Sequence, residues 1–162
     1  MVKRLTNPLR DRPTPLGSLL NAAGQRLSAE LDAALQEAGF VDLRAAHAPV
    51  FMAVDPDGTR VTVLAERAAM TKQAVGELIR YLAGRRYLHV EPDPEDRRAK
   101  RVSLTERGWQ ALELGEHVIA EFDTWLEGSV GADQVAALRA CLQRIIATPA
   151  RPGRTPPADR GG

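Results

Sequence analysis

The chain has 162 residues, of which 44% are hydrophobic and 27% are charged, a composition typical of one globular domain with a core of its own. No apolar run is long enough to span a membrane and no secretory signal pattern opens the chain, so we expect a cytoplasmic protein without a membrane partner. The single cysteine, Cys141, excludes an internal disulfide, and its place near the apolar register of the last helix predicts a buried, inert thiol.

The net charge of +1 hides an uneven distribution. Between Arg60 and Arg107 there are 11 lysines and arginines against 7 acidic residues, a net charge of +4, whereas the rest of the chain has 11 against 14, a net charge of −3. The excess favours a polyanionic partner for this central segment, although a solvated surface can show the same excess by chance.

The N-terminal third is predicted to hold an arm and two helices. Residues 1–13 carry four basic side chains and two prolines, which indicates a flexible basic arm that either touches a DNA backbone or is an uninvolved frayed terminus. From Pro15 to Ala38, apolar residues recur every three or four positions and predict a long amphipathic helix. A shorter helix follows around His47 to Val54, and a turn is predicted at Asp55 to Gly58.

The central stretch then predicts two short helices separated by a tight turn. Their apolar residues are Leu64, Ala65 and Ala68 in the first helix and Val75, Leu78, Ile79 and Leu82 in the second. Thr71 is placed to cap the second helix, and Lys72 lies at its N-terminal end, where a phosphate is favoured. The opposite face of this helix is polar and carries Gln73, Glu77 and Arg80. Gly76 borders that face and leaves room for a close approach.

Beyond Gly84 the pattern changes from helical to alternating. Tyr87 to Glu91 and Lys100 to Leu104 predict two strands of a hairpin, and Thr59 to Val61 predicts a short third strand beside it. Basic residues gather at or near the tip of the hairpin, namely Arg97, Arg98, Lys100 and Arg101. Helix, turn, helix and basic hairpin form a winged helix, whose second helix enters a major groove of DNA while the hairpin reaches the minor groove or backbone.

Two more helices and a tail complete the predicted chain. Thr105 caps the first of these helices, in which apolar residues recur until Gly128, and the second carries apolar residues from Val135 to Ile146. Residues 148–162 are rich in proline, glycine and charge, which predicts disorder.

The central residues resemble the multiple antibiotic resistance regulator (MarR) family of bacterial transcription factors. The resemblance rests on LAERAAMTKQAVGELIRYLAGRRYL followed by DPEDRRAKRVSLTERG, and it covers about a third of the chain. One departure is Ala69, where many relatives have glycine, so the turn must avoid positive φ or accept a small strain. The implied fold is mainly α with a small β-hairpin wing, a winged helix-turn-helix with flanking N- and C-terminal dimerisation helices.

The resemblance implies a homodimer that binds double-stranded DNA, because family members dimerise through their terminal helices and present two recognition helices to a two-fold site. The same apolar stripes could instead pack within one subunit, and the sequence does not divide the two. The implied organisation is a flexible arm at 1–13, dimerisation and supporting helices at 14–58, a DNA-binding lobe at 59–105, dimerisation helices at 106–147 and a disordered tail at 148–162.

The family resemblance also suggests a repressor of a palindromic operator that is released when a small aromatic effector binds between the DNA-binding lobe and the dimer helices. No pocket residue can be named from the sequence. The alternative is a winged-helix module that binds protein and has weak or no DNA specificity. An intact Gln73, Arg80 and basic wing argue against that alternative, since protein contact alone would not require them.

Individual contacts follow from side-chain chemistry. Gln73 is expected to pair with an adenine edge, and Arg80 to contact guanine or phosphate. Glu77 either accepts from a cytosine amino group or, as we favour, pairs with Arg80 or Tyr81 on the helix surface.

Phosphate and wing contacts complete the expected interface. Thr71 and Lys72 are expected to hold phosphate, which positions the protein without reading sequence. In the wing, either Arg97 or Arg98 resembles the arginine that relatives place in the minor groove. The other is expected to brace the hairpin, with a salt bridge from Asp93 or Asp96 holding the tip.

No enzyme chemistry is predicted. The three histidines, His47, His89 and His117, lack the spacing of a metal-binding helix, and surface or satisfied histidines are expected. No phosphate-binding glycine loop, nucleophile elbow or cofactor fingerprint occurs, so we expect no catalytic residue, metal or cofactor.

Overall fold

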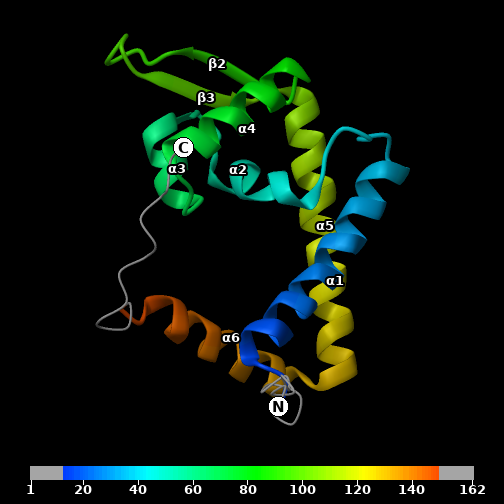
Figure 1. Cartoon of the computed structure of the whole chain (residues 1–162). Coiled ribbons are helices and arrows are strands. Elements are labelled where there is room, and N and C mark those ends of the chain that lie inside the picture. The colour runs from blue at the N-terminus through cyan, green and yellow to red at the C-terminus, as the bar shows by residue number, and fades with distance from the viewer. Residues whose placement is uncertain (1–12, 150–162) are drawn as a thin grey trace, which may run out of the picture. The chain divides into compact units, whose positions relative to one another are not determined.

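The computed structural model describes residues 13–149, which form six α-helices, one short 3₁₀-helix and a three-stranded sheet (Figure 1). The predicted basic arm and disordered tail lie outside the described residues, except for residue 13 and residues 148–149. The chain forms two compact units, which meet in sequence between Glu121 and Phe122. The fold class predicted from the sequence, mainly α with a small β wing, is confirmed.

The first unit holds the helix-turn-helix and the wing. Its elements are α1 (Leu16–Glu37), η1 (Ala45–His47), α2 (Ala48–Ala53), β1 (Thr59–Arg60), α3 (Val61–Arg67), α4 (Lys72–Gly84), β2 (Leu88–Pro92), β3 (Lys100–Leu104) and the N-terminal part of α5 (Glu106–Val130). The predicted elements are all present, with ends shifted by a few residues. Val61 begins α3 instead of closing β1, and Tyr87 precedes β2 instead of opening it.

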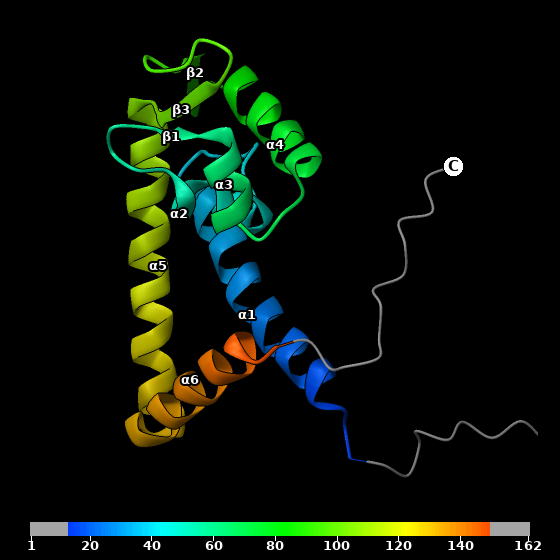
Figure 2. The same ribbon diagram turned by 90° about the vertical axis from the view of Figure 1, so that its left-hand side faces the viewer.

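The sheet is antiparallel in the order β1-β3-β2, so the strand predicted as an addition to the hairpin pairs with its second arm. Val102 lies at the centre of the sheet, opposite both Thr59 and Val90, and is fully buried. In both views α4 packs beside β2 (Figure 2). The sheet therefore ties the wing to the helix that carries the predicted recognition face.

The core of the first unit explains why α4 shows only one face to solvent. Val75, Ile79 and Leu82 are buried at spacings of four and three residues, which brings them onto one side of the helix. They join a cluster whose largest fully buried side chains are Tyr87, Leu64, Leu82, Val50, Val75 and Val102. Gln73, Glu77 and Arg80, on the other side of the helix, consequently point outward.

The turn between α3 and α4 does not avoid positive φ at Ala69, so it accepts the small strain that was the other possibility from the sequence. Ala69 has φ of 52°, in the left-handed region, and its amide donates to the carbonyl of Glu66 at 3.1 Å. The next amide, of Met70, donates to the carbonyl of Ala65 at 3.0 Å and closes the helix end. Alanine is thus tolerated in a conformation that favours glycine.

Ala69→Gly is therefore expected to raise the free energy of unfolding by about 1 kcal/mol, because glycine adopts the left-handed conformation without a Cβ conflict. Ala68→Gly is the matched control, since Ala68 has a right-handed φ of −76°. Glycine there should lower the free energy of unfolding by about 1 kcal/mol. Urea unfolding of both variants measures the difference. Equal destabilisation by the two glycines would show that the turn is unstrained.

The second unit contains the C-terminal part of α5 and α6 (Ala132–Ala147), joined at Gly131. It exposes several large apolar side chains, namely Trp125, Val130, Leu138, Ile145 and Ile146. Cys141 is also exposed, so the prediction of a buried thiol was wrong. The physical reason is helix geometry: at about 100° per residue, Cys141 lies roughly 240° around α6 from Val135, its buried residue. No helix among residues 13–149 is long and apolar enough to cross a membrane.

Candidate nucleic-acid interface

The outward face of α4 carries the three polar residues predicted for it. Gln73, Glu77 and Arg80 are all exposed. Gln73 Nε2 donates to Glu77 Oε1 at 3.4 Å, and Arg80 Nε donates to the carbonyl of Gly76 at 3.3 Å. Glu77 was expected to pair with Arg80 or Tyr81, and that expectation was wrong: its partner is the glutamine one turn earlier, at the i, i+4 spacing that brings helix side chains together.

The N-terminal end of α4 is organised as the sequence predicted. Thr71 Oγ1 accepts from the amide of Ala74 at 3.2 Å, which caps the helix. Lys72 is exposed beside this end. A Cβ built on Gly76 would meet nothing within 4 Å, so the centre of the outward face is open. Helix end and lysine together present a positive, accessible surface.

A buried carboxylate holds the wing. Asp93 has no exposed surface. The Nε and Nη2 atoms of Arg60 donate to its two carboxylate oxygens, each at 2.9 Å. Arg101 Nε donates to the same carboxylate at 3.2 Å, and the amides of Glu95 and Asp96 donate at 3.0 and 3.1 Å. The hydrogen bond from Arg60 is the main reason that the pKa of Asp93 lies well below its usual range, since burial acts in the opposite direction.

The bracing arginines are not those that the sequence suggested. Asp93 does form the salt bridge of the tip, but its partners are Arg60 and Arg101 instead of Arg97 or Arg98. Arg60 lies 33 residues before Asp93, and the short strand β1 brings it there by pairing with β3. This pairing was predicted, but nothing local in the sequence shows which arginine it places beside the carboxylate.

Three basic side chains of the wing remain directed to solvent. Arg97, Arg98 and Lys100 are exposed, and no side-chain hydrogen bond or ion pair joins them to another residue in the part of the chain that the structure describes. Because the acidic side chain at the base of the tip is already neutralised by Arg60 and Arg101, these three cations are available to an external anion.

A second polar cluster, absent from the sequence predictions, fixes the start of α5 to the loop after α1. Tyr87 Oη donates to Asp42 Oδ1, and Arg107 Nη2 donates to Tyr87 Oη at 2.7 Å. Burial and then the bond to Asp42 raise the pKa of Tyr87 to about 12. Burial raises the pKa of Asp42, but the bonds from Tyr87 and the charge of Arg107 outweigh it, so this pKa is lowered. Asp42 and Tyr87 are 45 positions apart in the sequence, so no local pattern signals their contact.

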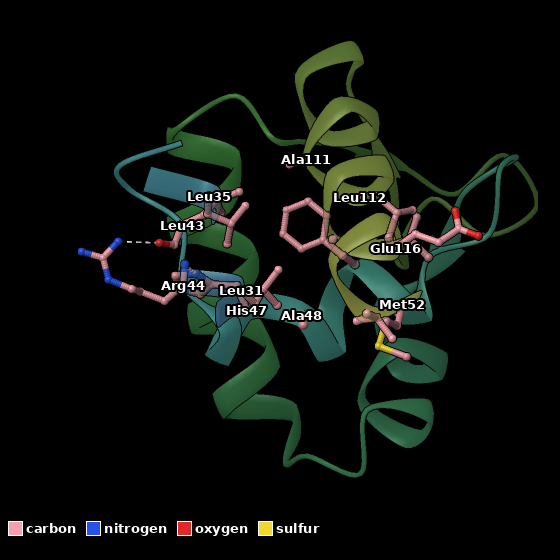
Figure 3. Close-up of a pocket in the computed structure, with 14 residues that line it drawn as sticks. Leu31, Leu35, Leu43, Arg44, His47, Ala48, Met52, Ala111, Leu112 and Glu116 are labelled. Atoms are coloured by element: carbon pink, nitrogen blue, oxygen red, sulfur yellow. Dashed lines mark hydrogen bonds between the residues drawn. The ribbon is translucent and has the colours of Figure 1, made fainter. Parts of the chain in front are cut away.

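An apolar cavity of about 430 Å³ lies within the first unit (Figure 3). Its lining residues come from α1, the following loop, η1, α2 and α5, and are Leu31, Leu35, Leu43, Arg44, His47, Ala48, Phe51, Met52, Val54, Ala111, Leu112, Gly115, Glu116 and Ile119. Arg44 Nη1 donates to the carbonyls of Val41 and Leu43, at 2.9 and 2.5 Å, and its guanidinium points away from the cavity in Figure 3. The cavity therefore offers mostly hydrocarbon surface.

His47 is the histidine of this lining. Burial, followed by the charge of Arg44, lowers its pKa. Its Nδ1 accepts from the backbone amide of Arg44 at 3.0 Å, so the proton of the neutral ring is on Nε2. His47 thus presents an uncharged imidazole to the cavity.

The arrangement matches known proteins in sequence and fold. The MarR family profile matches residues 41–99, which contain α2, α3, α4 and most of the wing. Over these residues the chain is similar to the MarR family. Members of this family are transcription regulators, and neither the family nor the fold is that of an enzyme. No curated protein sequence matches the chain.

Three solved structures share the fold of this chain. The S. aureus MepR–DNA complex has a TM-score of 0.72 at 18% identity, with 83% of this chain and 98% of that chain covered. Bordetella bronchiseptica BpsR, whose DNA binding is regulated by 6-hydroxynicotinic acid, has a TM-score of 0.66 at 25% identity, with 81% and 98% covered. Streptomyces coelicolor PcaV with its natural ligand has a TM-score of 0.69 at 20% identity, with 89% and 98% covered.

The two other histidines form ion pairs on the surface of the described residues. His89 and His117 are exposed and lie 3.6 and 3.3 Å from the carboxylates of Glu91 and Glu121. Among residues 13–149, no group of three or more histidine, cysteine, aspartate or glutamate side chains is arranged to hold a metal ion. The candidate site is therefore the polar outward face of α4 together with the exposed cations of the wing.

Proposed function

We propose that this protein is a MarR-family repressor that binds a palindromic operator as a homodimer and responds to a small aromatic effector. The observation that carries the proposal is that the basic residues of the wing fall into two sets. Arg60 and Arg101 neutralise Asp93, while Arg97, Arg98 and Lys100 remain available to an external anion. A hairpin braced from inside and cationic outside is suited to a polyanion.

Sequence would be read by α4. Gln73 pairs with an adenine edge in the major groove, and Arg80 contacts guanine or phosphate. Glu77 orients Gln73 through their 3.4 Å bond and leaves one acceptor oxygen for a cytosine amino group. Thr71 and Lys72 hold a phosphate at the helix N-terminus, where the exposed lysine adds to the helix dipole.

The wing and Gly76 would complete the contact. Arg97 or Arg98 enters the minor groove beside the reading site, and Lys100 contacts the backbone. The open space at Gly76 allows the duplex to approach α4 closely. Lysine and arginine side chains supply several of these contacts to a polyanion, so affinity should fall with salt.

A homodimer would cover the apolar side chains that each unit leaves exposed. In α1 these are Leu16, Leu19 and Leu20, and in the second unit Trp125, Leu138 and Ile146 are among them. Exposed stripes of this kind mark a protein interface, and a two-fold dimer would present two copies of α4 to a symmetric site. An effector would occupy the 430 Å³ cavity, whose lining favours a mainly apolar molecule.

Selection of binding sites from a genomic fragment library tests the function. Wild type is expected to enrich a two-fold symmetric site, and Gln73→Ala to relax preference at one base pair by about 1–3 kcal/mol. Gln110→Ala is the matched control, because Gln110 in α5 makes the same 3.4 Å bond to a glutamate one turn away and lies outside the interface. Its selected site should equal that of wild type.

The wing is tested over a salt series on the selected site. Arg97→Ala plus Arg98→Ala should weaken binding and make the slope of log affinity against log salt shallower, by about 1 for each arginine that contacts DNA. If wild type enriches no site and its binding does not respond to salt, DNA is not the partner. The exposed face would then belong to a protein contact.

A further inference from the structure

Tyr81 joins the outward face of α4 to the cavity. It follows Arg80 directly, and its ring stacks on the ring of His47, with centroids 5.1 Å apart and planes inclined by 20°. Its hydroxyl donates to the backbone carbonyl of Asp42 at 2.7 Å. Arg85, at the end of α4, places its guanidinium 4.2 Å from the centre of the same ring. One side chain of α4 therefore touches the cavity lining and the loop after α1.

The Asp42 end of this connection is fixed. The carboxylate of Asp42 accepts from Tyr87, which is fully buried, and from Arg107 at 3.3 Å. The ring of Tyr87 is in turn packed against Phe40 and Phe51, with centroids 6.2 Å apart in each case. The carbonyl that receives the Tyr81 hydroxyl thus belongs to a loop that is anchored in the core.

The His47 end is the part that a ligand can reach. His47 is half-buried, lines the cavity and lies at the end of the short helix η1. Its ring is held by one hydrogen bond, from the amide of Arg44, and by the stack on Tyr81. A molecule in the cavity that displaces this ring therefore alters the stack, whereas the carbonyl of Asp42 is held by its anchored loop.

We propose that the stacked pair of His47 and Tyr81 transmits occupancy of the cavity to α4, with Tyr81 as a positioning residue of the recognition helix. The proposal rests on the function proposed above. Tyr81 is one turn from Glu77 and two turns from Gln73, and a helix moves as a rigid body over that length. Displacing the ring pair shifts α4 relative to the anchored loop, and with it the side chains that read DNA.

The experiment uses a covalent occupant, so it does not depend on knowing the effector. In a Cys141→Ser background, Ala48→Cys places the only thiol in the cavity lining, and benzyl methanethiosulfonate then attaches one aromatic ring to it. Met52→Cys is a second attachment point, since Met52 also lines the cavity and is 72% exposed. Ala46→Cys is the matched control, because Ala46 is exposed and outside the lining.

Two quantities are compared before and after labelling, with intact mass confirming one label per chain. Amide hydrogen exchange of residues 72–84 reports on α4 whether or not DNA binds, and affinity for the selected site reports on function. Labelling through Ala48→Cys or Met52→Cys should speed exchange in α4 and lower DNA affinity by about 5- to 150-fold. Labelling through Ala46→Cys should change neither.

Variants of Tyr81 decide whether this residue is the route. Adding Tyr81→Leu, which lacks a ring, should leave exchange and affinity the same in labelled and unlabelled protein, whereas Tyr81→Phe, which keeps the stack, should restore the response. An equal response in the leucine variant, or none with Tyr81 present, would overturn the proposal. Failure of every unlabelled protein to select DNA would instead refute the proposed function, and exchange in α4 would still test the coupling.

Discussion

Asp93→Asn is expected to loosen the wing and abolish specific DNA binding while the helices stay folded. The asparagine would fit the site and could still accept from the amides of Glu95 and Asp96. It would bring no negative charge, however, so the guanidiniums of Arg60 and Arg101 would face a neutral amide. Removing one partner of a buried ion pair is strongly destabilising, because the charges left behind are uncompensated. The loss should be confined to β1 and the hairpin, which those two arginines connect.

Amide exchange in residues 88–104 and affinity for the selected site measure this effect. Asp96→Asn is the matched control from the same turn: Asp96 is exposed, and its Oδ1 accepts only a local bond, from the amide of Arg98 at 3.0 Å. It should change exchange and affinity little. Unchanged protection of the hairpin in Asp93→Asn would show that its strand pairing, without the buried carboxylate, holds the wing.

The same carboxylate predicts the response of the wing to acid. The pKa of Asp93 is depressed in the folded protein, chiefly by Arg60, relative to an unfolded value near 3.8. Its contribution to stability is therefore complete above about pH 3.8 and is lost as pH falls through the lower, folded pKa. Protection of the hairpin amides, taken relative to their intrinsic exchange rates at each pH, should fall below about pH 3.8 in wild type, and this acid response should be absent in Asp93→Asn.

The parts of the structure that could be predicted are those with a short-range cause. Burial of Val75, Ile79 and Leu82 follows from helical periodicity, so the outward position of Gln73 and Arg80 could be predicted from the same residues. Likewise, alternation and turn residues predicted the hairpin.

The features that were missed depend on contacts between distant residues. Which arginines brace Asp93 depends on how β1 lies beside β3, and the sequence shows only that several arginines are near. The link from Tyr81 to Asp42 spans 39 residues, and the cavity is lined from five elements, so neither has a periodic signature. Cys141 was misplaced because a helix with one buried residue does not bury its whole apolar register.

Gly108→Ala is expected to lower the free energy of unfolding strongly. Gly108 lies where α5 meets the hairpin. A Cβ at this position would lie 2.3 Å from the carbonyl oxygen of Tyr87 and 3.2 Å from Leu104 Cδ2. This backbone carbonyl cannot easily withdraw, because it accepts from the amide of Thr105 at 3.1 Å and the side chain of the same tyrosine is bound to Asp42. Gly108, the last residue of the segment LTERG, is thus needed for close contact of helix and strand.

The expected cost of Gly108→Ala is about 1–3 kcal/mol or more from overpacking, against a gain of about 0.5–1 kcal/mol from placing alanine in a helix. Gly128→Ala in the same helix separates the two effects, since a Cβ there meets nothing within 4 Å and only the gain applies. Urea unfolding should therefore shift in opposite directions for the two variants. A gain at both positions would mean that α5 can move away from Tyr87, and the start of the helix would then be a hinge instead of a fixed support for the wing.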